Sequence, residues 1–426
     1  MSFRMGLVSR SNDARSRAKR ILAASALLLL PALLGMTSTS QASASSQKPI
    51  KIWVQGTFSS PVNSSPSVLE GAQVAADAIN ATGGVNGHKI QVSGCNDDAN
   101  PDQTAQCARE GVAENPDAII GQWTYSAQAW SVLYGANIPV FPTVPFAAGD
   151  FTSAHAFPFV ASAVVSWTGL GMQMVADGCS KVGIIVNSGE AVIAPLMETG
   201  VTAGVESGHG TIVAPVTTPA VEPDYSAPVA QLVSEGAKCI YGLIPEGDFF
   251  KEWLAARENA SHPKIGTAGT TEVPVTQLRQ LGSEANGVIV QTVDYPLSYK
   301  GSPGLLAYKA AMKKYDPSGT VDELGSRTWS AVHIVAAVAS KLKSITTHNM
   351  LAALHAATGV STEIGPIADF ASAPGLVPGE PRDVVQNVFY ATTKSGQIVL
   401  TGNPNGVDAA QVVAKYCTKH GSSAGC

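Results

Sequence analysis

From residue 50 onward, short apolar runs that are typical of β-strands alternate with longer segments whose apolar residues recur at helical spacing. The apolar runs predict strands over residues 50–56, 89–95, 117–122, 138–144 and 157–162. Helices are expected between them over residues 65–81, 101–114 and 125–135. Because strands that alternate with helices form a parallel sheet covered by helices on both faces, this pattern predicts a doubly wound α/β fold.

The same alternation begins again in the middle of the chain. Helices are expected over residues 166–177, 192–206, 225–235, 248–259 and 274–281, with strands over 181–188, 211–217, 239–246, 264–270 and 287–295. Three further helices, over 303–315, 325–342 and 348–357, precede a hairpin over 387–400. The length of 426 residues suffices for two or three domains. We therefore expect two doubly wound sheets, each with its own core.

Residues 1–44 have the pattern of a secretory signal. Four basic residues between positions 15 and 20 precede a sixteen-residue apolar run over 21–36, and Ala42-Ser43-Ala44 forms a small-residue cleavage site. A membrane anchor is the alternative interpretation, but the run is shorter than the roughly 20 residues that a spanning helix needs. We expect cleavage after Ala44 and export as a soluble periplasmic or cell-surface protein.

The charge balance argues against nucleic acid as a partner. The whole chain has a net charge of −5, and removal of residues 1–44 leaves 21 basic and 31 acidic residues. No basic run remains in that mature part, whereas nucleic-acid-binding surfaces are built from clustered lysine and arginine.

The six cysteines predict disulfides, because disulfides persist in exported proteins. Fifteen pairings are possible. A strand end and the next helix bring the first two cysteines together, and the middle two can meet if their strands are parallel neighbours. The chain has no CxxC motif and no spaced histidine pair, so neither a metal nor a cofactor is expected. The expected pairs are Cys95–Cys107, Cys179–Cys239 and Cys417–Cys426.

The segment INATGGVNGHKIQV, residues 79–92, has three glycines within five positions. The helix before it has Ser67 and Glu70 at the spacing of a capping box. The first two glycines can adopt the left-handed conformation that ends a helix, and the Asn-Gly pair that follows is typical of a tight turn. This corner is therefore expected to join a helix to a strand.

The run GAQVAADAINATGGVNGHKIQVSGCNDDANPDQTAQC, residues 71–107, resembles the branched-chain amino acid (Leu/Ile/Val) type of periplasmic solute-binding protein. That family combines a GA-rich helix, an N-x-x-GG-x-x-G turn and a strand ending in an Asp pair. IIGQWTYSAQAW and IPVFPTV stand where the family has its next two strands. The resemblance implies that the glycine corner is scaffold, and it implies two lobes joined by a three-segment hinge. The expected lobes are 48–162 with 297–382, and 163–296 with 383–426.

Signals of catalysis are missing from the sequence. It contains no nucleophile elbow, no HExxH motif and no phosphate-binding glycine loop, so an enzyme is not expected. Asp97 and Asp98 form an acidic pair that could be half of a calcium site. We favour the alternative, in which they brace the turn into the next helix.

Candidate ligand contacts lie where strands of the first lobe end, because ligands of open α/β sheets bind beyond the carboxyl ends of the strands. Thr124 and Ser126 stand at a helix start, where hydroxyl and backbone N–H groups can hold a carboxylate. In the amino-acid-binding relatives this turn supplies small hydroxyl residues to the α-carboxylate of the ligand. Trp123 and Tyr125 add flat apolar faces, although Trp123 could instead belong to the core.

Two further segments of the first lobe are expected at the same edge. Thr143 and Val144 follow the fourth strand, where relatives often have small hydroxyl or alanine residues. Only Thr143 is polar there, which weakens the case for leucine itself as the ligand. The loop after the first strand adds Phe58 and Ser59.

The second lobe offers Asn187, Glu246, Glu272 and Tyr295 at its strand ends. In the family, an acidic group from this lobe meets the α-ammonium of the ligand, and Glu272 is the best match. Glu246 is a rival, and a solvated loop carboxylate is the alternative interpretation of both.

These features favour a monomeric extracytoplasmic solute-binding protein of an ABC importer. It would capture an amino acid or a related small carboxylate, with an apolar or aromatic body, by hinge closure and pass it to a membrane permease. A ligand-sensing domain that acts with a separate signalling partner is the main alternative. An exported enzyme is disfavoured by the missing catalytic motifs.

Overall fold

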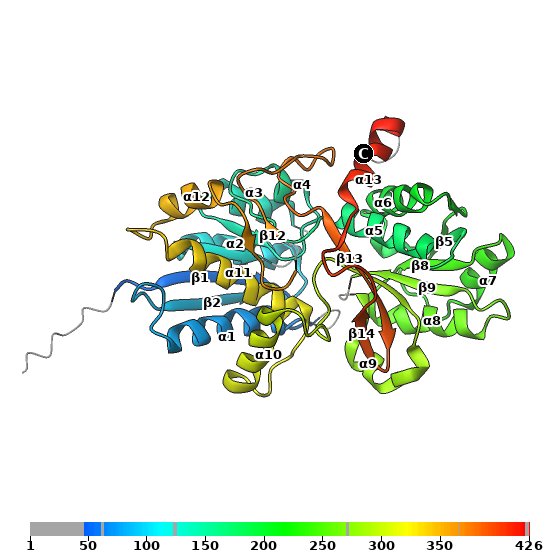
Figure 1. Ribbon diagram of the computed structural model, residues 1–426, viewed down its shortest axis with the longest axis horizontal. Coiled ribbons are helices and arrows are strands. Elements are labelled where there is room, and N and C mark those ends of the chain that lie inside the picture. The colour runs from blue at the N-terminus through cyan, green and yellow to red at the C-terminus, as the bar shows by residue number, and fades with distance from the viewer. Residues whose placement is uncertain (1–46, 61–63, 122–125, 270–271, 366, 422–425) are drawn as a thin grey trace, which may run out of the picture. The chain divides into compact units, whose positions relative to one another are not determined.

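The computed structural model describes residues 47–60, 64–121, 126–269, 272–365, 367–421 and 426. Their main strands form two sheets of parallel strands, and an antiparallel hairpin extends the second one (Figure 1). This arrangement confirms the α/β class that the alternating pattern predicted. Residues 1–46, which include the expected signal and its cleavage site, lie outside the described residues.

The first sheet has the strand order β2-β1-β3-β4, and all its pairs are parallel. The order reverses between β1 and β3, which are neighbours although β2 lies between them in the sequence. The elements of this part are β1 (Ile50–Gly56), α1 (Ser67–Ala81), β2 (Ile90–Asn96), α2 (Pro101–Ala113), β3 (Ala118–Gly121), α3 (Ala127–Gly135), β4 (Val140–Pro142) and α4 (Ala148–Thr152).

Side chains that alternate along β1 divide between two cores, as the two-residue period of a strand requires. Ile50, Ile52 and Val54 are at most 1% exposed and belong to the core that includes α1 and α11 (Glu323–Ala339). Trp53 points to the other face and packs in a smaller core with residues of α2 and α3, among them Leu133. The first sheet is therefore covered on both faces.

The second sheet has the order β14-β13-β10-β9-β8-β5-β6, and β7 also pairs with β5. Its order reverses at β5, which lies between β8 and β6. The parallel strands are β5 (Lys181–Asn187), β6 (Thr211–Ile212), β7 (Val216–Thr218), β8 (Cys239–Leu243), β9 (Lys264–Ala268) and β10 (Ile289–Thr292). The hairpin strands are β13 (Asn387–Lys394) and β14 (Gln397–Leu400), and β15 (Val407–Asp408) also pairs with β13.

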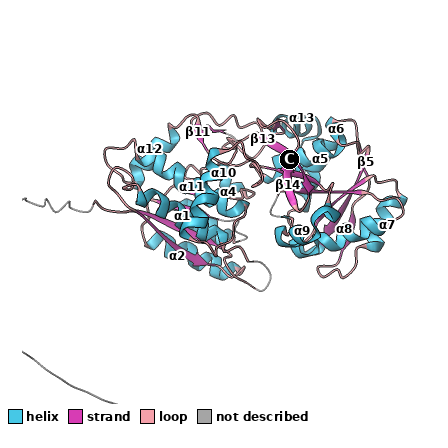
Figure 2. Cartoon of the chain, turned by 60° about the horizontal axis from the view of Figure 1, so that its bottom comes forward, coloured by secondary structure: helices cyan, strands magenta, loops and turns pink. Residues whose placement is uncertain are grey.

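Helices cover both faces of the second sheet as well (Figure 2). Ile184 packs with residues of α5 and α6, whereas the adjacent Ile185 packs with residues of α7 and α8. Burial of each such side chain stabilises the fold by about 1.5–3 kcal/mol. The helices are α5 (Ala163–Ala176), α6 (Ala194–Ser207), α7 (Ser226–Ser234), α8 (Phe249–Glu258) and α9 (Val275–Leu281).

The chain passes between the two sheets three times, after β4, after β10 and before β13. Between the second and third passages it forms α10 (Pro303–Tyr315), α11, α12 (Thr347–His355) and the short strands β11 (Val360–Ser361) and β12 (Ile367–Ala368). Helices α10 and α11 pack against α1, so this segment joins the first sheet. The residue limits of the two lobes remain predictions.

Two local expectations were wrong, and a helix near the C-terminus was not predicted. Residues 157–162 are not a strand: only Ala156 forms a bridge with Val140, and the buried apolar run that follows is a connecting segment. Apolarity alone does not separate a buried connection from a strand. The capping box is also absent, because Ser67 lies inside α1 and Glu70 instead accepts a hydrogen bond from the Thr320 N–H at 2.7 Å. Helix α13 (Ala410–His420) was not predicted, although its apolar residues recur at helical spacing.

The glycine corner has the scaffold role that the sequence predicted. Gly84 has a φ of +81°, and a Cβ there would lie 2.2 Å from the carbonyl oxygen of His88. The Asn80 side chain donates to the Ile90 carbonyl and accepts from the Ile90 N–H, both at 2.8 Å. The turn is thus fixed to the start of β2.

All three expected cysteine pairs are joined in the structure. Cys179 and Cys239 meet because β5 and β8 are parallel neighbours, as Val182 is in register with Cys239. Cys95, at the end of β2, meets Cys107 on α2. Cys417, on α13, is joined to Cys426, the last residue of the chain.

Candidate functional site

The predicted ligand contacts stand at the carboxyl ends of strands, and those after β1 and β3 flank the reversal of strand order in the first sheet. Phe58 and Ser59 follow β1, and Ser126 follows β3 at the start of α3. Thr143 and Val144 follow β4. Trp123, Thr124 and Tyr125 lie outside the described residues. A reversal of strand order leaves room between two loops, which is where open α/β sheets bind ligands.

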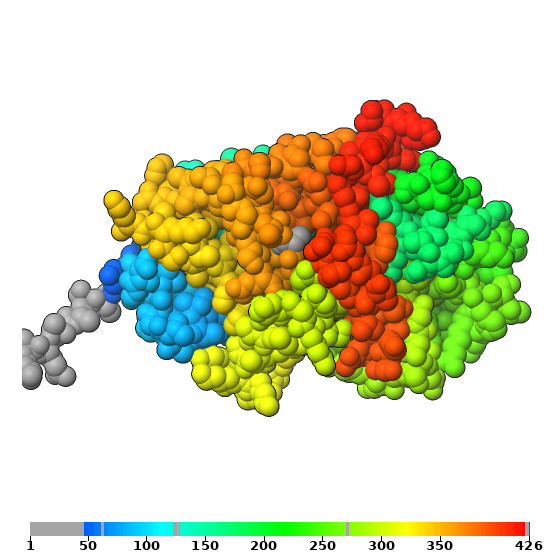
Figure 3. Space-filling model, viewed as in Figure 1, coloured from blue at the N-terminus to red at the C-terminus, as the bar shows by residue number. Residues whose placement is uncertain are grey.

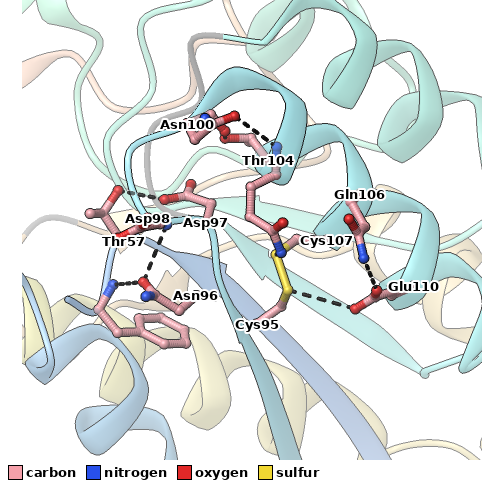
Figure 4. The surroundings of a disulfide bond; sticks show 12 residues. Thr57, Cys95, Asn96, Asp97, Asp98, Asn100, Thr104, Gln106, Cys107 and Glu110 are labelled. Atoms are coloured by element: carbon pink, nitrogen blue, oxygen red, sulfur yellow. Dashed lines mark hydrogen bonds between the residues drawn. A yellow bond between two sulfur atoms is a disulfide. The ribbon is translucent and has the colours of Figure 1, made fainter. Parts of the chain in front are cut away.

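The loop after β1 is held by the end of β2 (Figure 4). The Asn96 side chain accepts hydrogen bonds from the backbone N–H groups of Phe58 (2.8 Å) and Ser59 (3.2 Å), and it donates to the Ser59 carbonyl (2.9 Å). Phe58 is partly buried, whereas Ser59 is exposed. The loop therefore presents these two residues from a braced backbone.

The first residue of the acidic pair after β2, Asp97, braces the turn. Asp97 is 4% exposed and accepts hydrogen bonds from the Thr57 hydroxyl at 2.6 Å and the Ala99 N–H at 3.1 Å. Asn100 caps α2 by accepting from Asp102 N–H and Gln103 N–H. Within the described residues, no group of three or more His, Cys, Asp or Glu side chains is arranged to hold a metal ion.

The hydroxyls of Ser126 and Thr143 both take part in the scaffold. Ser126 is 6% exposed, and its oxygen caps α3 by accepting from the Ala129 N–H at 3.2 Å. Thr143 is fully buried, and its hydroxyl donates to the Gly121 carbonyl at 3.1 Å. No acceptor for the Ser126 O–H stands among the described residues, whereas the O–H of Thr143 is already used. Ser126 is thus the better placed of the two to bind a carboxylate.

A buried ion pair in contact with Thr143 was not predicted from the sequence. Arg327, on α11, donates from Nε to Asp294 at 2.6 Å and from Nη2 to the other carboxylate oxygen at 3.4 Å. Its Nη1 donates to the Thr143 carbonyl at 3.2 Å. Arg327 is 3% exposed and Asp294 is fully buried. The guanidinium therefore connects the turn after β4 to the passage after β10.

Glu272, which follows β9, ends a chain of hydrogen bonds. Trp167 donates to the Tyr241 hydroxyl at 2.8 Å, and that hydroxyl donates to Glu272 at 3.2 Å. The other carboxylate oxygen of Glu272 accepts from the Thr267 hydroxyl (2.7 Å) and the Ala268 N–H (3.0 Å). Burial raises the pKa of Glu272 to about 7, and the nearby Glu190 adds to this.

A second carboxyl group, Glu252 on α8, lies next to Glu272 and was also missed. It is 1% exposed, and burial together with the charge of Glu272 raises its pKa to about 8. Its Oε1 has no hydrogen-bond partner among the described residues. The signal in the sequence was a glutamate on a helix face that is otherwise apolar, between Phe249 and Ala256.

Asn187 and Glu246, two further candidates of the second sheet, differ in whether the scaffold already engages their side chains. Asn187 is 1% exposed and fixes its own loop, accepting from the Gly189 N–H and donating to the Pro219 carbonyl. Glu246 is exposed on a short turn after β8, and its pKa is raised by partial desolvation of the carboxylate and then by the charge of Asp322. Within the described residues, the scaffold thus engages the Asn187 amide but forms no hydrogen bond to the Glu246 carboxylate.

Tyr295 belongs to the passage between the sheets. Its hydroxyl donates to the Pro404 carbonyl at 2.8 Å, and its ring packs against Tyr299 and Phe389 with centroids 4.6 and 4.8 Å apart. Its backbone N–H donates to the Ile364 carbonyl at 2.7 Å. These contacts hold Tyr295 in the passage, where it also lines a pocket of about 490 Å³, and its role as a ligand contact stays a prediction.

Comparison with known proteins identifies the family. The model of the periplasmic binding protein family matches residues 49–377. The chain belongs to the periplasmic binding protein family. The Leu/Ile/Val-binding protein of Escherichia coli (strain K12) is 24% identical over 331 residues, which are 75% of this chain and 86% of the relative. The resemblance to the Leu/Ile/Val type is thereby confirmed.

Solved structures of similar fold have different ligands in their names. The fatty acid ABC transporter substrate-binding protein from Thermomonospora curvata has a TM-score of 0.70 at 16% identity, covering 86% of this chain and 94% of its own. A solute-binding protein of an ABC transporter from R. palustris, in complex with 4-hydroxybenzoate, has a TM-score of 0.66 at 18% identity, covering 84% and 96%. At such identities the likeness concerns the fold.

In this periplasmic binding protein, no helix of the described part has the length and apolarity to cross a bilayer. Its family consists of solute-binding proteins rather than enzymes. The groups at the strand ends accordingly offer hydrogen bonds and charge for binding: a hydroxyl at a helix start on the first sheet, and carboxyl groups with raised pKa values on the second.

Proposed function

We propose that this protein captures an amino acid, or a related small carboxylate with an apolar or aromatic body, and passes it to a membrane ABC permease. The observation that carries the proposal is the charge at the strand ends. A helix start with a hydroxyl follows β3 of the first sheet, and Glu246 and Glu272 follow β8 and β9 of the second. A ligand with a carboxylate and an ammonium complements both sets.

The start of α3 would hold the carboxylate. The first N–H groups of a helix have no partner within the helix, and the helix dipole places partial positive charge there. Ser126 adds a hydroxyl proton, because its oxygen already accepts from Ala129. Thr124 would supply the second hydroxyl, with Trp123 and Tyr125 beside the body of the ligand, as the sequence analysis proposed.

Glu272 would pair with the ammonium. Glu190 and Glu252 lie near it, and Tyr241 and Thr267 hydrogen-bond to it, so a cation that reaches this group relieves repulsion among carboxylates. Because burial raises the pKa of Glu272 to about 7, the group is partly protonated at neutral pH. An ammonium ligand would displace that proton, so its affinity is expected to rise from pH 6 to pH 8.

Closure would follow from contact with both lobes. A ligand that touches groups of both sheets favours the state in which they approach, and the three passages between the sheets supply the hinge. This mechanism forms and breaks no covalent bond, and the solute reaches the permease chemically unchanged.

Native mass spectrometry of protein purified without refolding tests the proposal by identifying a carried-over solute, and calorimetry then measures its affinity.

Ser126→Ala should weaken binding about tenfold to a hundredfold, since a hydrogen bond to a charged group is worth roughly 1.5–3 kcal/mol. Ser302→Ala is the matched control, because Ser302 is also a buried helix cap, on α10. Equal affinity in both variants would contradict the carboxylate site.

Glu272→Gln decides between the two ligand classes. For an ammonium-bearing ligand the variant should lose affinity and its rise from pH 6 to pH 8. For a plain carboxylate the affinity should hold or increase, because a repulsive charge disappears. Thermal melts check that the variant is folded.

A further inference from the structure

A hollow of about 300 Å³ shares none of its lining residues with the proposed site. One side is formed by α9 and the turn of the β13–β14 hairpin, and the other by residues 297–300, α10 and the start of α11. In Figure 3 the hairpin, in red, lies beside the yellow-green segment that follows β10. Its volume is at the small end of the range that ligands occupy.

Three cations line this hollow: Arg279, Lys300 and Lys309. Lys309 donates to the neutral carbonyl of Leu297 at 2.8 Å. Within the described part of the chain, no ion pair or hydrogen bond engages the side chains of Arg279 and Lys300. Their positive charge is therefore available to a ligand.

One carboxyl group also lines the hollow, and it does not cancel this charge. Glu323 is 5% exposed, and burial raises its pKa to about 8, with contributions from Asp294 and Asp322. At pH 7 the group is thus mostly neutral. The Leu297 N–H hydrogen-bonds to it as well. The hollow accordingly has a net positive charge at neutral pH.

Apolar side chains complete the lining, among them Val275, Val321 and Ile398. The walls are tied together, because the Ser298 hydroxyl donates to the Ile398 carbonyl at 2.6 Å. The Gly396 N–H donates to the Gly282 carbonyl at 3.0 Å, which fixes the hairpin turn to the end of α9. A preformed shape lowers the entropic cost of binding.

We propose that this hollow is a second ligand site, for a small organic carboxylate with a compact apolar body. Arg279, Lys300 and Lys309 hold the carboxylate by charge-assisted hydrogen bonds, and the aliphatic side chains contact the body. Inorganic anions lack the body, and neutral molecules of the same shape lack the charge, so both bind less well. Because the walls come from both sides of the passage after β10, occupancy also holds these segments together.

The test uses 4-fluorobenzoate as the probe and follows its binding to the full chain by ¹⁹F NMR. The double variant R279Q/K300Q should lose at least tenfold in affinity. The matched control is K341Q/K343Q, which removes two exposed lysines and the same charge elsewhere. It should bind the probe as the unchanged protein does.

Competition separates the alternatives. Inorganic phosphate and 4-fluorobenzyl alcohol should each need at least a tenfold higher concentration than benzoate to displace the 4-fluorobenzoate probe. If phosphate competes equally, or if R279Q/K300Q binds like K341Q/K343Q, the proposal is overturned. A loss in Ser126→Ala instead would place the probe at the strand ends after β3, which overturns this inference and leaves the proposed function standing.

Discussion

Replacement of Arg327 by methionine should destabilise the fold strongly. Asp294 is fully buried and Arg327 is 3% exposed, so the variant leaves a carboxylate in the interior without its counter-charge. Removing one partner of a buried ion pair costs about 3–5 kcal/mol. The Thr143 carbonyl also loses a donor, which adds roughly 1 kcal/mol or more. Against a typical total stability of about 5–15 kcal/mol, this is a large fraction.

Urea denaturation followed by circular dichroism measures this loss as a lower midpoint at an unchanged slope. Two controls isolate its cause. Arg257→Met breaks an exposed pair, in which the Arg257 and Glu284 side chains are 50% and 62% exposed, and should cost less than about 1 kcal/mol. The double variant D294N/R327M removes both charges and should recover most of the loss. A cost for Arg327→Met no larger than that for Arg257→Met would refute the reasoning.

Two further predictions concern stability. Glu252→Gln should make the fall in stability with rising pH less steep. Burial raises the folded pKa of Glu252 to about 8, so this group alone costs the wild type roughly 1.4 kcal/mol per pH unit between about pH 4.5 and 8, and urea midpoints across that range measure the difference between the two proteins. Parallel curves for the two proteins would contradict this. Removal of the Cys179–Cys239 disulfide should cost about 4 kcal/mol and removal of Cys417–Cys426 about 3, because the closed loops span 60 and 9 residues. Serine pairs and thermal melts test this order, and a reversed order would count against it.

The periodicity of the sequence sufficed for the secondary structure that sets the fold. The pattern that predicts an element belongs to the segment itself and does not depend on which elements pack against it. This holds for the apolar runs at β1 and β5 and for the helical spacing in α1. The pairing of Cys179 with Cys239 was predicted on the condition that their strands are parallel neighbours, and the structure meets that condition by placing β5 beside β8. The local pattern misled the prediction for residues 157–162, because these apolar residues are buried without pairing to a neighbouring strand.

The candidate site depended more on tertiary contacts. The sequence placed Ser126 and Glu272 at strand ends, which the strand order supports, but it gave no sign that the Thr143 hydroxyl is already used by Gly121. The pairing of Arg327 with Asp294 was equally invisible, since these residues are 33 positions apart and belong to different elements. Periodicity reports which face of an element is buried. Which polar groups meet inside, and hence which remain available to a ligand, is decided only when the elements pack.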